Sequence, residues 1–315
     1  MELPPALRRA VDQALNGTSA ADLARASAVL SQRYRAETRD GRAHIADDVA
    51  ACAYLAARLP ATYAATRASM EAVAALRPQF APRSLLDFGA GPGTALWAAR
   101  DAWPGLDTAL LVESSKPIRG FGAEFADESG VAQVAWQTAL EGAATHDLVT
   151  LAYVLDELTD GSRAALIARL WSLAGDTLLI VEPGTPAGWR RILEARAMLI
   201  ADGAHLVAPC PHASACPLEA PDWCHFSRRV ARSRAHLAAK EAEVPWEDEK
   251  YIYLAVARHP IVSPQARVIA PPRKGSGKAE LKLCCNDGTA RSKLVTRREG
   301  DAFKIARRSE WGDAL

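Results

Sequence analysis

Two groups of cysteines stand out in the last third of the chain. The first group comprises Cys210, Cys216 and Cys224, and the second comprises Cys284 and Cys285. In a reducing compartment, clustered thiols hold metals more often than they form disulfides. The sequence therefore predicts a metal centre that involves residues 208–226.

The spacing of the first three cysteines is wide. Five residues separate the first pair and seven separate the second. Zinc sites usually pair their ligands at C-x₂₋₄-C spacing, whereas four thiolates are what a [4Fe-4S] cluster takes. The spacing favours the cluster, with zinc as the second candidate because His212 and His225 adjoin the cysteines. Loop hydrogen bonding is the favoured role for both histidines.

A glycine-rich loop, Asp87-Phe-Gly89-Ala-Gly91-Pro-Gly93-Thr, follows a predicted strand and opens a predicted helix. Glycine lets the backbone turn tightly and lets a ligand approach the helix N-terminus. A dinucleotide loop has the spacing G-x-G-x-x-G, whereas this loop has G-x-G-x-G after an acid. That form resembles the class I methyltransferases that bind S-adenosylmethionine.

This resemblance implies roles for two acids. Glu113 ends the second predicted strand and is expected to bind the ribose, because one carboxylate can accept hydrogen bonds from two vicinal hydroxyls. Asp87 is expected to orient the loop or the amino-acid end of the cofactor. The expected cofactor-binding residues are Asp87, Gly89, Gly91, Gly93 and Glu113.

Catalytic residues are harder to identify. The segment after the fourth predicted strand contains Asp156 and Glu157, not the Asn/Asp-Pro-Pro-Tyr/Phe tetrad of amino-group methyltransferases. Either acid could face the cofactor, but Glu157 is interpreted as the start of the next helix, where acids suit the helix dipole. Glu182 is expected at the rim of the pocket. No catalytic residue is identified, so enzymatic activity is left open.

Three regions are predicted along the chain. Residues 1–80 show apolar positions at three- and four-residue spacing and are expected to be helical. Residues 81–260 alternate short apolar runs with helical stretches, which indicates an α/β domain with a parallel, doubly wound, Rossmann-like sheet. The cysteine segment 208–226 is an insertion in this domain, followed by a basic helix near residues 228–240. Residues 261–315 are predicted to form a small β module.

Within this module, strand-like runs occur near residues 281–284, 292–296 and 302–306, after a turn or linker at 271–277. The module carries twelve Lys and Arg residues against six Asp and Glu, a net charge of +6, although the whole chain has only +1. Such a basic surface suits an anionic partner.

No apolar run approaches the roughly 20 residues of a membrane helix, and the N-terminus lacks the layout of a secretory signal. A cytoplasmic location without a membrane partner is therefore expected. The oligomeric state is left open, with a monomer expected.

Several motifs together resemble one family. They are Cys-Pro-His, Cys-Pro-Leu, Asp-Trp-Cys-His-Phe-Ser-Arg-Arg, Arg-Val-Ile-Ala-Pro-Pro-Arg-Lys and Ala-Arg-Arg-Ser-Glu-Trp-Gly-Asp, in that order. Over roughly residues 80–315 the chain resembles the methyltransferase-like assembly factors of the mitochondrial small ribosomal subunit, a family that also has bacterial relatives.

In that family four cysteines hold a [4Fe-4S] cluster. The resemblance implies that Cys210, Cys216, Cys224 and Cys284 are the ligands. Neighbouring side chains of a strand point to opposite faces, so only one of Cys284 and Cys285 should reach the cluster. The resemblance also implies that the small ribosomal subunit or its rRNA is the partner, bound by Lys and Arg clusters that neutralise phosphates. The alternative is an active S-adenosylmethionine-dependent rRNA methyltransferase.

Overall fold

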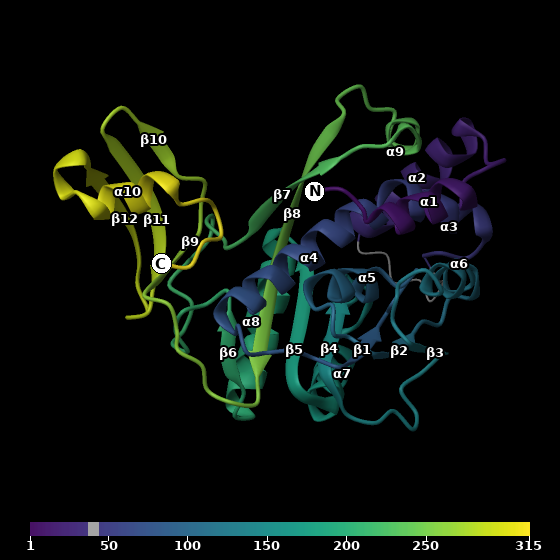
Figure 1. Cartoon of the computed structure of the whole chain (residues 1–315), viewed down its shortest axis with the longest axis horizontal. Coiled ribbons are helices and arrows are strands. Elements are labelled where there is room, and N and C mark those ends of the chain that lie inside the picture. The colour runs from purple at the N-terminus through teal and green to yellow at the C-terminus, as the bar shows by residue number, and fades with distance from the viewer. Residues whose placement is uncertain (37–43) are drawn as a thin grey trace.

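The structure is a computed structural model that describes residues 1–36 and 44–315. The chain begins with four helices, α1 (Pro5–Ala14), α2 (Ala20–Arg35), α3 (Asp48–Ala57) and α4 (Leu59–Leu76). The Ser19 hydroxyl accepts a hydrogen bond from the backbone N–H of Asp22 at 3.1 Å, which caps the start of α2. Figure 1 shows α1, α2 and α3 grouped at one end of the molecule, whereas α4 runs across the sheet toward the other end.

A central sheet of eight strands forms the main domain. Its strands are β1 (Ser84–Phe88), β2 (Thr108–Val112), β3 (Gln133–Gln137), β4 (His146–Ala152), β5 (Ala174–Pro183), β6 (His205–Ala208), β7 (Phe226–Ala231) and β8 (Trp246–Ala257). They are ordered β3-β2-β1-β4-β5-β8-β6, with β7 also paired to β8. The first five strands are parallel, but β8 is antiparallel to β5, β6 and β7. The sheet is therefore mixed, which corrects the prediction of a parallel sheet.

The helices between the strands are α5 (Thr94–Ala102), α6 (Lys116–Ala126), the short η1 (Leu155–Glu157), α7 (Asp160–Leu173) and α8 (Pro186–Ala201). The strand order reverses between β1 and β4. Because parallel crossovers are right-handed, the helices before and after this reversal cover opposite faces of the sheet. The loops after β1 and β4 meet at the carboxyl edge of the strands, where open α/β sheets bind ligands.

The cysteine segment joins β6 to β7, and the short helix α9 (Arg234–Ala239) follows β7. The predicted basic helix near 228–240 is wrong in its first part. Phe226 and Val230 are buried while Ser227 and Arg229 are not, a two-residue period that suits a strand paired to β8.

The C-terminal module has its own four-stranded sheet and stands at one end of the molecule (Figure 1). Its elements are β9 (Ala266–Val268), β10 (Arg273–Gly275), β11 (Lys278–Cys285), β12 (Ala290–Thr296), η2 (Arg297–Glu299) and α10 (Asp301–Arg308). Two predictions fail here, because 271–277 contains β10 and 302–306 lies in α10. Phe303 and Ala306, three residues apart, are buried on one helix face in the core of the module, which explains the helix.

Among the described residues, no helix has the length and apolar character that a membrane crossing requires.

Candidate cofactor pocket and metal centre

The glycine-rich loop connects β1 to α5 at the carboxyl edge of the sheet. Gly89, Gly91 and Gly93 have φ values of +70°, +55° and +79°, a region that glycine adopts without strain. At Gly89 a Cβ would lie 2.4 Å from Cγ2 of Val154, so the loop also approaches the segment after β4 too closely for a side chain.

Glu113 follows β2 and holds this loop in place. Its carboxylate accepts hydrogen bonds from the backbone N–H groups of Gly91 at 2.9 Å and Ser115 at 2.7 Å. The residue lines a cavity of about 770 Å³. The structure thus places Glu113 against the glycine-rich loop, while ribose binding by Glu113 stays a prediction.

Not all of the expected cofactor residues reach this cavity. Gly89, Gly91 and Glu113 line it, whereas Asp87 and Gly93 are not among its lining residues. Asp87 is buried and accepts a hydrogen bond from the Thr150 hydroxyl at 2.6 Å. Burial raises the pKa of Asp87 to about 7, and the hydrogen bond from Thr150 opposes this increase.

Other parts of the chain contribute lining residues that the sequence did not reveal. They include Tyr54 and Arg58 near the α3–α4 junction, Tyr153 after β4, Arg190 in α8 and Glu249 in β8. Tyr153 has a φ of 59°, a conformation that costs a non-glycine residue free energy and is often found at functional sites. Its hydroxyl donates to Glu249 at 2.9 Å, which links the segment after β4 to β8.

Contrary to the expectation from the sequence, Glu157 does not begin the next helix. It lies in η1 and lines the cavity, whereas α7 begins only at Asp160. Burial, followed by the nearby carboxyls of Asp156 and Glu113, raises the pKa of Glu157 to about 8. The raised pKa favours the protonated carboxyl, which can donate a hydrogen bond.

The raised pKa predicts how stability depends on pH. Because unfolded Glu157 ionises near its ordinary value of 4.5 while the folded residue stays neutral, stability is present at low pH and is lost as pH rises toward about 8. The side chain is 39% exposed, so screening limits the loss to about 1–2 kcal/mol. Urea unfolding at about pH 5 and about pH 8 measures this. Between these pH values the free energy of unfolding should decline less for Glu157→Gln than for the unmodified chain, and equal declines would contradict the raised pKa of Glu157.

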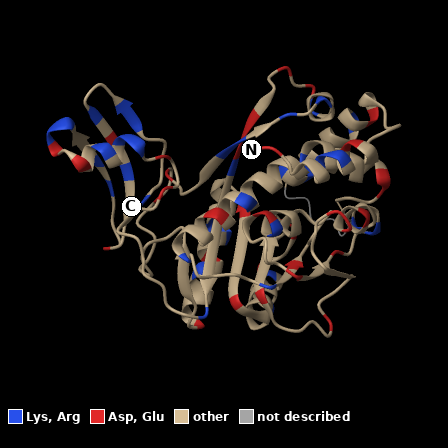
Figure 2. Cartoon of the chain, viewed as in Figure 1, with Lys and Arg blue, Asp and Glu red and all other residues tan. Residues whose placement is uncertain are grey.

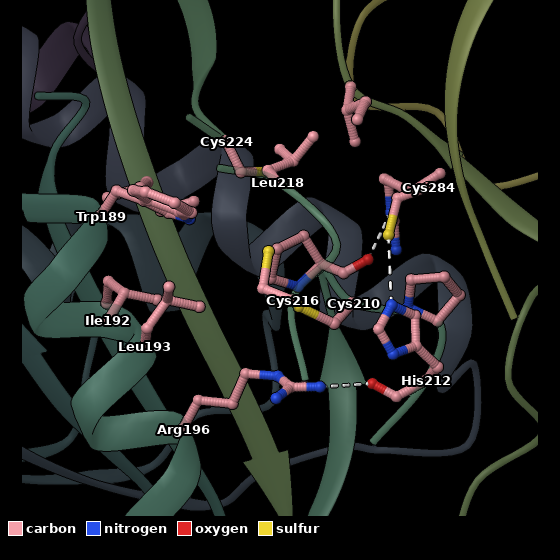
Figure 3. Close-up of a pocket in the computed structure, with 15 residues that line it drawn as sticks. Trp189, Ile192, Leu193, Arg196, Cys210, His212, Cys216, Leu218, Cys224 and Cys284 are labelled. Carbon is pink, nitrogen blue, oxygen red and sulfur yellow. Dashed lines mark hydrogen bonds between the residues drawn. The ribbon is translucent and has the colours of Figure 1, made fainter. Parts of the chain in front are cut away.

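Four of the five clustered cysteines line a second cavity, of about 30 Å³. Cys210, Cys216 and Cys224 come from the cysteine segment, and Cys284 comes from β11 of the C-terminal module. All four are free thiols. Figure 3 shows them between the side chains of α8 and His212, so residues distant in sequence meet at one place.

Cys285 faces away from this cavity. It is buried in the core of the module with Leu281, Leu283 and Phe303, on the opposite face of β11 from Cys284. Of the two adjacent thiols, only Cys284 lines the cavity with the other three.

Burial and, after it, neighbouring thiols raise the pKa of Cys210, Cys224 and Cys284. Burial is the main cause for Cys224, followed by Cys210, Cys216 and Cys284. For Cys284, burial and then Cys210 and Cys216 raise the pKa to about 12. Neutral thiols are therefore favoured unless a cation is bound, and metal binding would deprotonate them. Within the described ranges, no three Cys, His, Asp or Glu side chains meet closely enough to hold a single metal ion.

The two neighbouring histidines behave differently. His212 lines the cavity, with its Nε2 3.4 Å from Sγ of Cys284. His225 stacks on Trp223 at 5.0 Å between ring centroids and also contacts Trp311 edge to face. The hydrogen-bonding role expected for His225 agrees with its 3.3 Å contact with the Trp223 carbonyl.

The strand order around β1 and β4, the glycine-rich loop after β1 and the acid after β2 define the fold of a class I S-adenosylmethionine-dependent methyltransferase. The family model described as "Mitochondrial small ribosomal subunit Rsm22" matches residues 48–315. The chain belongs to this family.

Curated relatives agree with this assignment. The chain is 30% identical over 290 residues to "Ribosome assembly protein METTL17, mitochondrial" of Homo sapiens, an alignment that covers 83% of this chain and 61% of that protein. It is 28% identical over 193 residues to "Rsm22-cox11 tandem protein 2, mitochondrial" of Schizosaccharomyces pombe, covering 47% of this chain and 26% of the relative. The chain thus spans less than two thirds of the length of these relatives.

The location predicted from the sequence is wrong by this comparison. The family and the matched relatives are described as mitochondrial, not cytoplasmic. The prediction used the lack of a long apolar segment. Such a lack concerns membrane-spanning helices only, and it does not distinguish one aqueous compartment from another.

Solved structures with a similar arrangement are methyltransferases of low sequence identity. One is an O-methyltransferase family protein from Burkholderia thailandensis, with 13% identity, a TM-score of 0.46, and coverage of 78% of this chain and 73% of that one. Another is magnesium protoporphyrin IX methyltransferase from Synechocystis with bound S-adenosylmethionine, with 16% identity, a TM-score of 0.40, and coverage of 62% and 79%.

Proposed function

We propose that the chain is an assembly factor of the small ribosomal subunit that binds rRNA through its C-terminal module and holds this module in place with a [4Fe-4S] cluster. The family description and the name of the human relative support the ribosomal role. The observation that carries the cluster proposal is the meeting of Cys284 with Cys210, Cys216 and Cys224 around one cavity.

The donor set suits an iron-sulfur cluster. Four thiolates are its usual ligands, and a cluster supplies an electron-accepting or purely structural centre when bound. A cluster is wider than one ion, so its ligands surround a volume instead of meeting at a point. In this role the three loop cysteines would hold the cysteine segment, and Cys284 would hold the module.

The basic side chains of the module supply a surface for rRNA. Figure 2 shows Lys and Arg gathered on β10, β12 and α10. Six of them are exposed and have no carboxylate partner among the described residues: Lys278, Lys293, Arg297, Arg298, Arg307 and Arg308. By contrast, Arg228, Arg229 and Arg232 of the main domain pair with acids. The module is therefore the favoured site for phosphate contacts.

Removing two of these charges should weaken RNA binding and its salt dependence together. The test is the double variant Arg307→Ala with Arg308→Ala. We expect the slope of the logarithm of the binding constant against the logarithm of salt concentration to become less steep by about one to two, because each phosphate contact contributes roughly 0.9 to its magnitude. Filter binding of a small-subunit rRNA fragment at several salt concentrations measures this. Arg8→Ala with Arg9→Ala, in α1, removes the same charge elsewhere, and equal effects from both pairs would contradict the proposed surface.

The same proposal includes S-adenosylmethionine in the larger cavity. The loop of Gly89 and Gly91, with Glu113 beside it, supports this cofactor. One experiment tests whether the methyl group of S-adenosylmethionine is transferred to rRNA. The protein and the labelled cofactor are incubated with small-subunit RNA from a strain that lacks this protein. Label in the RNA would favour the methyltransferase alternative over an assembly role with a bound cofactor.

A further inference from the structure

Two buried arginines line the cysteine cavity in addition to the four thiols. Arg196 in α8 is 5% exposed and Arg267 in β9 is 2% exposed. Arg196 Nη2 donates to the backbone carbonyls of His212 at 2.7 Å and Ser214 at 2.8 Å. Figure 3 shows Arg196 reaching the His212 carbonyl beside the cysteines.

Arg267 joins three parts of the chain at the same place. Its Nε donates to the Pro209 carbonyl at 2.9 Å, and its Nη1 donates to the Gly312 carbonyl at 2.8 Å. In the antiparallel pairing of β9 with β11, Arg267 lies directly opposite Cys284. Opposite residues share a face of the sheet, so the guanidinium is on the Cys284 side of the module.

Neither arginine has its charge or its hydrogen bonds fully compensated. Within the part of the chain that the structure describes, neither forms an ion pair with a carboxylate, and each keeps one buried N–H group without a partner, Nε of Arg196 and Nη2 of Arg267. A buried charge with no counter-charge is strongly destabilising. Two such cations around one small cavity imply that an anion belongs there.

We infer that Arg196 and Arg267 compensate the negative charge of the metal-thiolate centre and thereby raise its reduction potential. This inference rests on the proposed cluster. A centre with four thiolate ligands is anionic, and one-electron reduction makes it more so. Nearby cations and N–H donors therefore favour the reduced state, as hydrogen bonds and local charge do in iron-sulfur sites generally.

The test is an anaerobic redox titration of the whole chain and of Arg196→Met and Arg267→Met, after iron and sulfide analysis. Methionine keeps much of the apolar volume and removes the charge. We expect each variant that retains the cluster to have its equilibrium constant for reduction lowered at least tenfold, about 59 mV for one electron. The control is Arg258→Met, because Arg258 is also bonded to backbone carbonyls, of Ala174 and Trp171, but does not line the cavity.

A charge-conserving variant covers the case in which a methionine variant loses the cluster. Arg267→Lys should then retain iron and a potential near that of the unmodified chain, because lysine keeps the positive charge. Unchanged potentials in both methionine variants, or loss of iron in Arg267→Lys as complete as in Arg267→Met, would overturn the inference. Absence of iron and sulfide from the unmodified chain would instead refute the proposed cluster itself.

Discussion

Replacing Cys216 by serine is expected to remove most of the bound iron and to lower binding to small-subunit particles at least tenfold. Cys216 lines the cavity with Cys284, which belongs to the other part of the molecule. Losing one ligand opens a cross-link between the cysteine segment and β11, and by analogy with a disulfide that closes a long loop this costs on the order of 3 kcal/mol. Iron analysis, denaturant unfolding and co-sedimentation with small-subunit particles measure the three effects.

The chain contains a matched control for this substitution. Cys285 is adjacent to a proposed ligand but is buried in the core of the module. Cys285→Ala should therefore keep iron and particle binding and lose only the stability that a small core change costs. Full iron content in Cys216→Ser, or equal iron loss in both variants, would contradict the ligand assignment.

Replacing Gly89 by alanine is expected to abolish measurable binding of S-adenosylmethionine and to destabilise the fold by about 2 kcal/mol or more. A Cβ there would lie 2.4 Å from Cγ2 of Val154, and φ is +70°. The loop must therefore shift. This shift also moves the backbone N–H of Gly91, which donates a hydrogen bond to Glu113. Isothermal titration with the cofactor and thermal unfolding measure both consequences.

Gly105 offers the comparison for this second substitution. A Cβ at Gly105 meets no atom within 4 Å, and no positive φ constrains the residue. Gly105→Ala should leave cofactor binding unchanged. If Gly89→Ala bound the cofactor as tightly as Gly105→Ala does, the larger cavity would not be the cofactor site.

The central strands were predictable because they are buried and apolar on both faces. β5 contains the continuous apolar run 178–181, and β1 contains the buried pair Leu85 and Leu86. β3 gives a weaker signal, because it is a half-exposed edge strand whose apolar run, 134–136, has only three residues. Residues 302–306 of α10 were assigned as a strand because five residues, with Lys304 in the middle, are too few to separate a period of two from one of 3.6.

For the candidate site, spacing and residue type identified the cysteines but not their surroundings. The two-residue period of a strand required that one of Cys284 and Cys285 turn inward, and the packing of β11 places Cys284 on that side. Arg196 and Arg267 gave no signal, since a single arginine in a helix or strand is ordinarily solvent-exposed. Likewise, the cavity position of Glu157 depends on η1, which separates it from α7.

The most direct measurement is anaerobic purification of the unmodified chain followed by an absorption spectrum and by iron, sulfide and zinc analysis. A four-cysteine cluster predicts about four iron and four sulfide per chain, with a broad visible absorption that dithionite bleaches. About one zinc per chain, with no sulfide and no visible absorption, would contradict the account.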